Sequence, residues 1–342
     1  NNNWRIDISG NTFDTPILNS LGDMRTSQRT LGQRVYNGVE TSLTGKINNH
    51  NILFKLYRTN EKVRTSEYFD QIRMIEFPEY KSYESNVDGI GMQLQDQLNI
   101  NDKVKLVFGV DYNKAGTNLR FWNAPTAATN NISLERAGSS PNGEVSALGV
   151  FLQGHISLFN KFLIINPSIR TDFVSYEMSS TFGLDDKISL KKENKTILNP
   201  NLGVQMNLKP SVSLHANTGT SFRYAVANQI AGYFESFTTT NPTRVNVTLG
   251  NAELNNETSF TWDAGIRFNK PSRGLYLDLT YFKTNVNDRI IITADNARIN
   301  TDWTALDGNV YKIASYRTYA NANYSRISGL ELDAHYDIGN LI

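Results

Sequence analysis

A two-residue alternation of apolar and polar side chains, repeated in segment after segment, constrains this chain more than any other feature. In residues 90–100 the apolar side chains share one parity: Ile90, Met92, Leu94, Leu98 and Ile100. Because successive side chains of a strand point to opposite faces, the segment is predicted to be a strand with one apolar face and one polar face. The same division recurs in residues 104–112, 148–158, 202–208, 260–268 and 275–281.

The connections between these segments alternate between short and long. Short turns are predicted near residues 48–51, 101–102, 160–161, 209–210 and 269–274. Long polar stretches of about 20 to 35 residues lie between them, at residues 65–85, 113–144, 178–195, 223–256 and 287–323. A water-soluble sandwich also alternates in polarity, but it seldom carries loops that long at every second connection. Outer-membrane barrels do, so the pattern predicts an all-β fold, a transmembrane antiparallel β-barrel.

Composition agrees with a barrel and excludes other classes. The chain is 39% hydrophobic with a mean hydropathy of -0.42, which suits strands that are apolar on one face only. No apolar run approaches the 18 or so residues of a membrane-spanning helix. With 34 basic and 33 acidic residues and no basic stripe, nucleic acid is not an expected partner.

The sheet predicted from this chain is unfinished. Five hairpins and the end segments 4–8 and 326–338 give about 12 to 14 strands. The sequence stops at residues 339–342, where a turn should lead to another strand, and an unpaired edge in lipid leaves backbone groups without partners. We therefore expect residues 1–342 to be one barrel region that belongs to a larger barrel.

Several segments resemble the barrel region of TonB-dependent outer-membrane receptors. They are Asn-Pro-Asn-Leu-Gly-Val at 199–204 with the strand that follows to 223, Gly-Asn-Ala-Glu-Leu-Asn-Asn-Glu-Thr at 250–258, Asp-Ala-Gly-Ile-Arg-Phe at 263–268, and residues 319–334. The resemblance implies a bacterial outer-membrane location, a barrel of about 22 strands with a plug in its lumen, and uptake of a scarce nutrient energised by the TonB system. The chain departs from the family pattern because the plug, the TonB-contacting segment and the last strands are not found in it. It also has Tyr224 and Ala225 where the family has Ala-Pro, and Ala252, Asn255 and Asn256 where it has Pro, Lys and Pro.

The resemblance makes a ferric siderophore the expected cargo, because iron chelates are the common ligands of this family. The haem-importing branch carries a histidine between its Phe-Arg and Asn-Pro-Asn-Leu motifs, and no histidine lies between Arg223 and Asn251 here, which disfavours haem. Cobalamin stays open, and a passive porin is the other alternative. Guanidinium groups and rings on the long stretches suit an anionic, aromatic ferric chelate, although such side chains also pack loops together. The candidate ligand-binding residues are Arg120, Phe121, Trp122, Arg223, Tyr224, Tyr233, Phe234, Arg244, Trp303 and Tyr311.

No catalytic, metal or cofactor site is expected. His155, His215 and His335 fall on the polar parity near short turns, so they should point into the lumen at its periplasmic end. His155 and His215 are three strands apart, about 14 Å, which is too far to share one metal ion. No Gly-x-Ser-x-Gly elbow or phosphate-binding glycine loop occurs, so an enzyme is disfavoured. The expected partners are outer-membrane lipid, a ferric chelate, and the TonB system through a plug.

Overall fold

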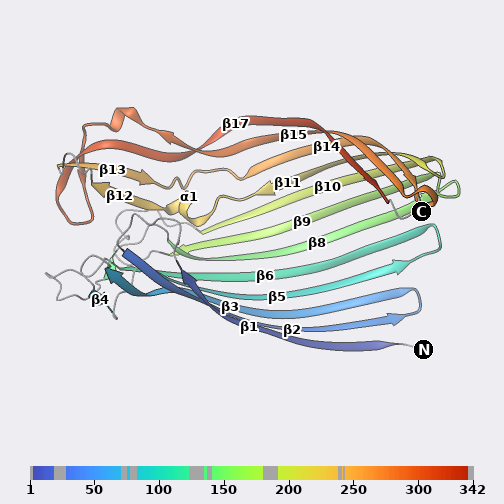
Figure 1. The fold of residues 1–342 in the computed structure, drawn as a ribbon, viewed down its shortest axis with the longest axis horizontal. Helices are drawn as coiled ribbons and strands as arrows, with labels where there is room; N and C mark the ends of the chain where they lie inside the picture. Colours follow the sequence, from blue (N-terminus) through green and yellow to red (C-terminus); the bar gives the residue numbers. More distant parts are fainter. Residues whose placement is uncertain are drawn as a thin grey trace.

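The protein is a single large β-sheet bent into an open trough. The computed structural model describes residues 3–18, 28–70, 75–77, 83–122, 135–136, 141–179, 192–237, 241 and 243–337. Twelve long strands build the wall of the trough: β1 (Trp4–Leu18), β2 (Gln28–Ile47), β3 (His50–Asp70), β5 (Tyr83–Asn99), β6 (Val104–Trp122), β8 (Asn142–Leu158), β9 (Leu163–Ser179), β10 (Lys192–Lys209), β11 (Val212–Arg223), β14 (Glu257–Lys270), β15 (Leu275–Ala294) and β17 (Val310–Tyr336). Each pairs antiparallel with the next long strand, as predicted (Figure 1).

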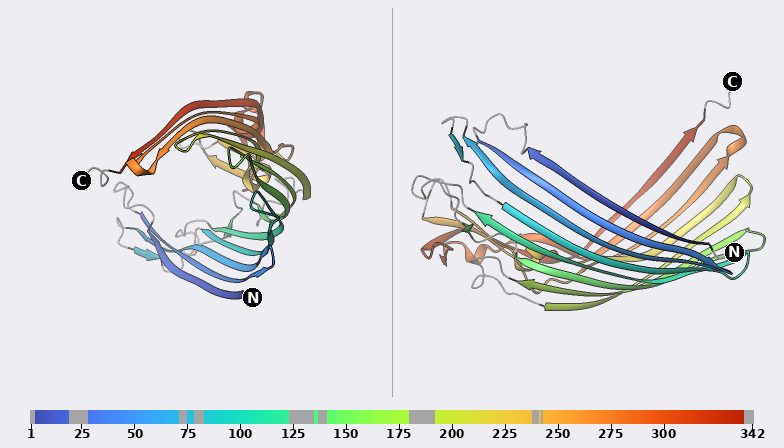
Figure 2. Two further views of the ribbon diagram at one scale, coloured as in Figure 1. Left: turned by 90° about the vertical axis from the view of Figure 1, so that its right-hand side faces the viewer. Right: turned by 90° about the horizontal axis from the view of Figure 1, so that it is seen from below.

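The remaining elements are short. They are β4 (Ile75–Phe77), β7 (Glu135–Arg136), β12 (Tyr233–Phe237), β13 (Arg244–Leu249), β16 (Asp302–Thr304), the helix α1 (Ala227–Ala231) and the 3₁₀ turns η2 (Pro271–Arg273) and η3 (Asn296–Arg298). No helix in the described ranges is long and apolar enough to cross a membrane. Viewed along the strands, β1 and β17 lie at the two margins of the trough (Figure 2).

The two faces of the sheet differ as the alternation predicts. Leu94, Leu152 and Leu277 are 45%, 46% and 38% exposed, so the apolar parity does not lie in a dry centre between two sheets. On the opposite parity, Asp172 and Asp278 are buried among other polar side chains. Side chains converge on the concave face of a bent sheet and diverge on its convex face. The convex face is therefore apolar and the concave face polar, which is the arrangement of a membrane barrel.

Short turns join the strands at one end of the trough, as predicted. They include residues 48–49, 159–162 and 210–211, and the 3₁₀ turn η2, which closes with Gly274 at φ 61°. That conformation is readily accessible to glycine, which has no Cβ.

The long polar stretches, predicted as the connections between the strands, are partly strand themselves. The strands run on into them: β6 continues to Trp122, β8 begins at Asn142 and β10 begins at Lys192. Ladder pairing is kept while the outward side chains change from apolar to polar. In these stretches the change to polar side chains marks the end of the apolar, membrane-facing band, whereas the strand itself continues. Hydrophobic periodicity alone cannot distinguish the end of the band from the end of the strand.

Candidate functional site

The end of the trough opposite the short turns carries a compact platform, which we define as β12, β13, β16 and the first part of β17, residues 310–318. Its strands pair as β12 with β13, β13 with β17 and β16 with β17, and the β13–β17 pair is parallel (Figure 1). Its centre is fully enclosed, because Val245 and Ile313 are 0% exposed and Val247 is 1% exposed. The alternation of Val245, Val247 and Leu249 places these side chains on one face of β13. The platform is therefore a folded unit with its own hydrophobic core.

A ring pair and a carboxylate hold one side of the platform. The rings of Tyr233 and Trp303 stack with centroids 6.3 Å apart, and Trp303 Nε1 donates a hydrogen bond to the Tyr233 hydroxyl at 3.3 Å. That hydroxyl in turn donates to Glu235 at 2.5 Å, and the other oxygen of Glu235 accepts from the backbone N–H of Leu306 at 2.9 Å. Burial of the ring is the main reason that the pKa of Tyr233 lies above its usual value, and the bond to Glu235 adds to the rise.

Polar contacts fix the other side of the platform. Arg244 Nη2 donates to Asn300 Oδ1 at 2.6 Å and to the Ile313 carbonyl at 3.1 Å. The Tyr311 hydroxyl donates to Asp307 at 2.7 Å, which lowers the pKa of that carboxyl. The Arg244 guanidinium is thus used within the platform.

Arg223 and Tyr224 lie at the end of β11, beside the platform. Arg223 forms a two-bond ion pair with Glu257, with both N–O distances 2.8 Å, and Glu257 also accepts from the Ile290 N–H at 2.7 Å. The Tyr224 ring meets the Tyr176 ring edge-on at 5.1 Å. The segment after β11, with α1, therefore packs on the concave face of β9.

Arg120, Phe121 and Trp122 end β6, four strands from β11 in the sheet. The Arg120 guanidinium lies 5.0 Å from the centre of the Trp122 ring, a cation–π contact. Arg120 shares the parity of Lys114, which faces outward, whereas Phe121 has the inward parity.

The structure thus divides the ten candidate residues into three groups. Tyr233, Phe234, Arg244, Trp303 and Tyr311 meet on the platform, Arg223 and Tyr224 lie at the end of β11, and the other three end β6. All but Tyr224 belong to strands, so describing them as loop residues was wrong. Their exposure differs, since Tyr233 is 2% exposed and Phe234 is 54% exposed.

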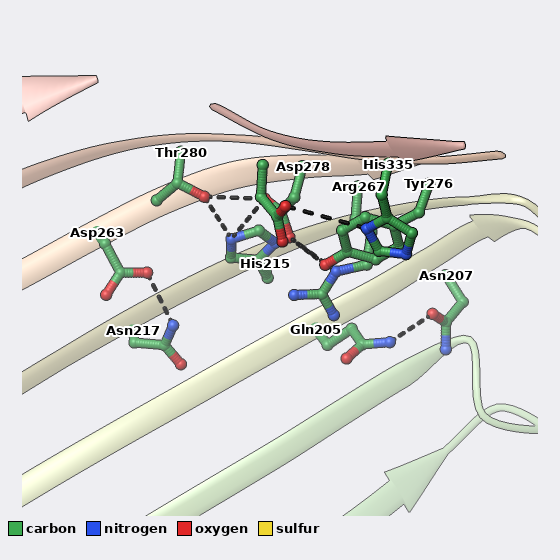
Figure 3. A network of polar contacts seen from close by, with 11 residues as sticks. Gln205, Asn207, His215, Asn217, Asp263, Arg267, Tyr276, Asp278, Thr280 and His335 are labelled. Atoms are coloured by element: carbon green, nitrogen blue, oxygen red, sulfur yellow. Dashed lines mark hydrogen bonds and ion pairs between the residues drawn. The ribbon is translucent and has the colours of Figure 1, made fainter. Parts of the chain in front are cut away.

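Sequence analysis did not find two polar clusters on the concave wall. In the first, Asp278 accepts from Arg267 at 2.8 Å and from Thr280 at 2.9 Å, and Thr280 lies 3.1 Å from His215 Nε2 (Figure 3). These residues line a hollow of about 370 Å³. The lumen orientation predicted for His215 is consistent with this position, but its partners Thr280 and Asp278 lie on β15, two strands along the sheet, and could not be paired with it from sequence.

The second cluster is a bridge across three strands. Arg170 on β9 donates to Asp111 on β6 at 2.6 and 2.9 Å and to Asp172 at 2.6 Å, passing over Gly149 on the strand between them. A Cβ added to Gly149 would lie 2.0 Å from Arg170 Nη2, so the guanidinium fills the space that a side chain at this position would need. Among the described residues, no group of three or more His, Cys, Asp and Glu side chains is arranged to hold a metal ion.

Comparison with known proteins gives a family. Residues 1–341 match the family described as "TonB dependent receptor-like, beta-barrel". Among curated proteins, the heme/hemopexin utilization protein C of Haemophilus influenzae is 25% identical over 269 residues, which cover 74% of this chain and 34% of that protein. The chain therefore spans about a third of the length of the curated relatives it matches.

Solved structures share the fold. The hemophore receptor HasR of Serratia marcescens, in complex with its hemophore HasA and heme, matches with a TM-score of 0.68 and 16% identity over 98% of this chain and 50% of that one. The ferric enterobactin receptor PfeA of Pseudomonas aeruginosa matches with a TM-score of 0.62 and 14% identity, over 96% of this chain and 49% of that one.

Proposed function

Since the chain belongs to the TonB dependent receptor-like β-barrel family, we propose that it forms part of the wall and the ligand platform of a receptor that imports a ferric siderophore. The family is one of transport receptors, and its place is the bacterial outer membrane. In the proposal, uptake is energised by the TonB system acting through a plug in the lumen. The long-loop end then faces the outside, where the platform meets the ligand.

The observation that carries the proposal is the packed core of the platform. Val245, Val247 and Ile313 are almost completely enclosed, and the ring stack of Tyr233 on Trp303 is tied to β12 through Glu235. A surface held in this way loses little conformational entropy when a ligand binds, which favours affinity. Preorganisation of this kind suits a receptor that must capture a scarce ligand.

The proposal divides the candidate residues into two roles. Tyr233, Trp303 and Arg244 position the platform, because their polar atoms or rings are engaged within it. Phe234 and Arg223 are the proposed ligand contacts. Phe234 is 54% exposed, and the Arg223 side chain is 52% exposed although Nε and Nη2 pair with Glu257. An aromatic face and a guanidinium would contact the rings and the negative charge of a ferric chelate.

Haem is the second candidate, because the curated relatives carry heme and hemopexin in their names. Against it, the four histidines of the chain are His50, His155, His215 and His335, and all lie on wall strands toward the short turns. An axial ligand to haem iron from the platform would have to be a tyrosine such as Tyr311.

The test is a titration of the purified full-length receptor, followed by tryptophan fluorescence. The probes are a ferric tris-catecholate, a ferric hydroxamate, hemin and cobalamin. We expect quenching by one of the two ferric chelates, and Phe234→Ala should weaken that binding about tenfold. The matched control is Phe260→Ala, which removes a ring of similar exposure (44%) from the outward face and should change little. Binding of hemin or cobalamin alone would refute the siderophore proposal, and open ion conductance with no binding would favour a passive porin.

A further inference from the structure

The concave face of β9 changes from polar to apolar toward the platform end of the trough. Nearer the short turns its inward side chains are polar, as at Asp172. Further along the strand the same parity is occupied by Val174, Tyr176 and Met178, which are almost fully buried. The outward side chain of Glu177 on the same stretch is polar and exposed. An apolar concave face is unstable against water, so this part of the wall needs a cover.

The cover is the segment that follows β11, residues 224–232, which includes α1 and which we call the partition. Tyr224, Ala227 and Ile230 pack on the apolar part of β9 and on neighbouring side chains of β8 and β10. Ile230 also packs against a second buried cluster that includes Ile290 of β15. The partition therefore lies against the concave face in two places. It fills the space that a ligand would need in order to touch the wall there.

The concave face of β1, β2 and β3 lies across the trough from β15 and β17 (Figure 2). Phe13 on β1 has the parity opposite to that of Ile8, which is an exposed, outward side chain. Arg34 and Tyr36 on β2 have the parity opposite to that of the outward Val39. All three point into the trough, and we call them the stacking cluster. The Phe13 side chain is 40% exposed and that of Arg34 is 48% exposed, so a ligand can reach both.

Contacts within the stacking cluster hold its flat groups in place. The rings of Phe13 and Tyr36 have centroids 5.1 Å apart and planes within 11° of parallel. Arg34 Cζ lies 5.5 Å from the centre of the Phe13 ring. Arg34 Nε and Nη2 donate to the two oxygens of Glu61 at 2.9 and 3.0 Å, which fixes the guanidinium plane and balances its charge. The cluster therefore offers flat faces and no net charge.

The stacking cluster lies beyond the apolar band of the wall. On β3 the outward side chains change from the apolar Leu56 to Arg58, Asn60 and Lys62. Glu61, which pairs directly with Tyr36 in the ladder, falls within this polar run. The cluster thus stands toward the platform end of the trough, on the side that the partition leaves to a ligand.

We propose that the stacking cluster is a second binding subsite, which takes the aromatic rings of the cargo. The proposal rests on the proposed function, because it takes the cargo to be a ring-bearing ferric chelate. The rings of the chelate stack on Phe13 and Tyr36, and the flat face of the Arg34 guanidinium extends that surface. Since the cluster carries no net charge, it distinguishes chelates by their rings. A chelate without rings gains no affinity there.

The test measures binding at the stacking cluster through a single cysteine in the full-length receptor. Asn11→Cys places a thiol two residues from Phe13 on the same face of β1, and the chain has no cysteine of its own. A membrane-impermeant maleimide should label this thiol, and a saturating ferric tris-catecholate should slow the labelling about tenfold. A ferric hydroxamate without rings should slow it less than about twofold. The unmodified receptor is the blank.

Substitutions in the Asn11→Cys receptor then assign the protection to the rings. Phe13→Ala should raise the tris-catecholate concentration for half protection about tenfold, and Phe13→Tyr, which keeps a ring, should restore it. The matched control is Phe260→Ala, which removes a ring from the outward face and should leave half protection unchanged. If the Phe13→Ala receptor fails to fold, Tyr36→Leu provides the same comparison.

The partition is tested with Ala147→Cys, whose thiol would lie on β8 beneath it. This thiol should react slowly with or without a chelate, and fast labelling in the free receptor would overturn the claim that the partition covers this wall.

The outcomes separate the subsite from the proposed function. A tris-catecholate that quenches tryptophan fluorescence without protecting Asn11→Cys would overturn the subsite and leave siderophore import standing. Equal protection by both chelates, or binding of the hydroxamate alone, would do the same. Binding of hemin or cobalamin alone would refute the proposed function, and the subsite would fall with it.

Discussion

The bridge made by Arg170 depends on the absence of a side chain at Gly149, so Gly149→Ala should break it. A Cβ at this position would stand 2.0 Å from Arg170 Nη2 and 2.6 Å from its Cζ. Neither distance is possible between non-bonded atoms. The guanidinium must leave its place, and its two hydrogen bonds to Asp111 are lost.

The size of the effect follows from burial. Breaking a fully buried ion pair costs about 3 to 5 kcal/mol, because it leaves an uncompensated charge. The Arg170 side chain is 37% exposed and that of Asp111 is 24% exposed, and a displaced guanidinium can still pair with Asp172, so water and this second carboxylate offset much of the cost, and we take about 2 kcal/mol. Replacing glycine by alanine gains about 0.4 to 1 kcal/mol through the unfolded chain. The free energy of unfolding should therefore fall by about 1 to 1.5 kcal/mol.

The assay is guanidinium unfolding of the full-length receptor in phosphatidylcholine vesicles. Gly116→Ala is the control, since its Cβ meets no atom within 4 Å and the substitution should be neutral or slightly stabilising. Because Gly149→Ala acts by displacing Arg170, it should add no further loss in a protein that already carries Arg170→Met. Additive losses in the double variant, or a Gly149→Ala receptor as stable as the Gly116→Ala one, would refute the reasoning.

Three further predictions concern the outward face and the platform. Leu94→Arg places a charge against hydrocarbon and should cost about 2 to 4 kcal/mol of unfolding free energy, whereas Gln95→Arg faces the lumen and should cost almost none in the same assay. Tyr233→Phe removes the hydroxyl that joins Trp303 to Glu235, so the platform should lose about 1 to 2 kcal/mol and be cleaved faster by protease, while the barrel keeps its heat-modifiable gel mobility. The pKa of Asp307 is lowered in the folded protein, so its contacts stabilise the platform fully above the ordinary aspartate pKa of about 3.9. This stability is lost as pH falls through the folded pKa, and proteolysis of the platform should then become faster. Asp307→Asn should abolish this acid-dependent change in proteolysis.

The strands of the wall could be predicted from sequence because each is specified by residues that are close together in the chain. Each strand carries its own alternation, and a turn such as the one at residues 48–49 needs only neighbouring residues. The platform could not be predicted in this way. Its parallel pairing joins β13 to residues 312–318 of β17, and nothing in either segment specifies the other. The apolar alternation at Val245 and Val247 was a usable sign of a strand, but its partner depends on how the whole end of the sheet folds.

The same limit explains why sequence could collect candidate residues without assigning their roles. Tyr233 and Phe234 are neighbours of similar chemistry, yet one is 2% exposed and the other 54% exposed. The two rings point to opposite faces of β12. Which face is turned to the core is decided only when β12 pairs with β13, where Val247 lies opposite Glu235. A ring turned toward that core stabilises the platform, and a ring turned away can meet a ligand. Substitution of Tyr233 would therefore lower the affinity for the ligand indirectly, by loosening the platform. Substitution of Phe234 would lower it by removing a ligand contact while the platform stays intact, so the Phe234 variant is the one that tests contact alone.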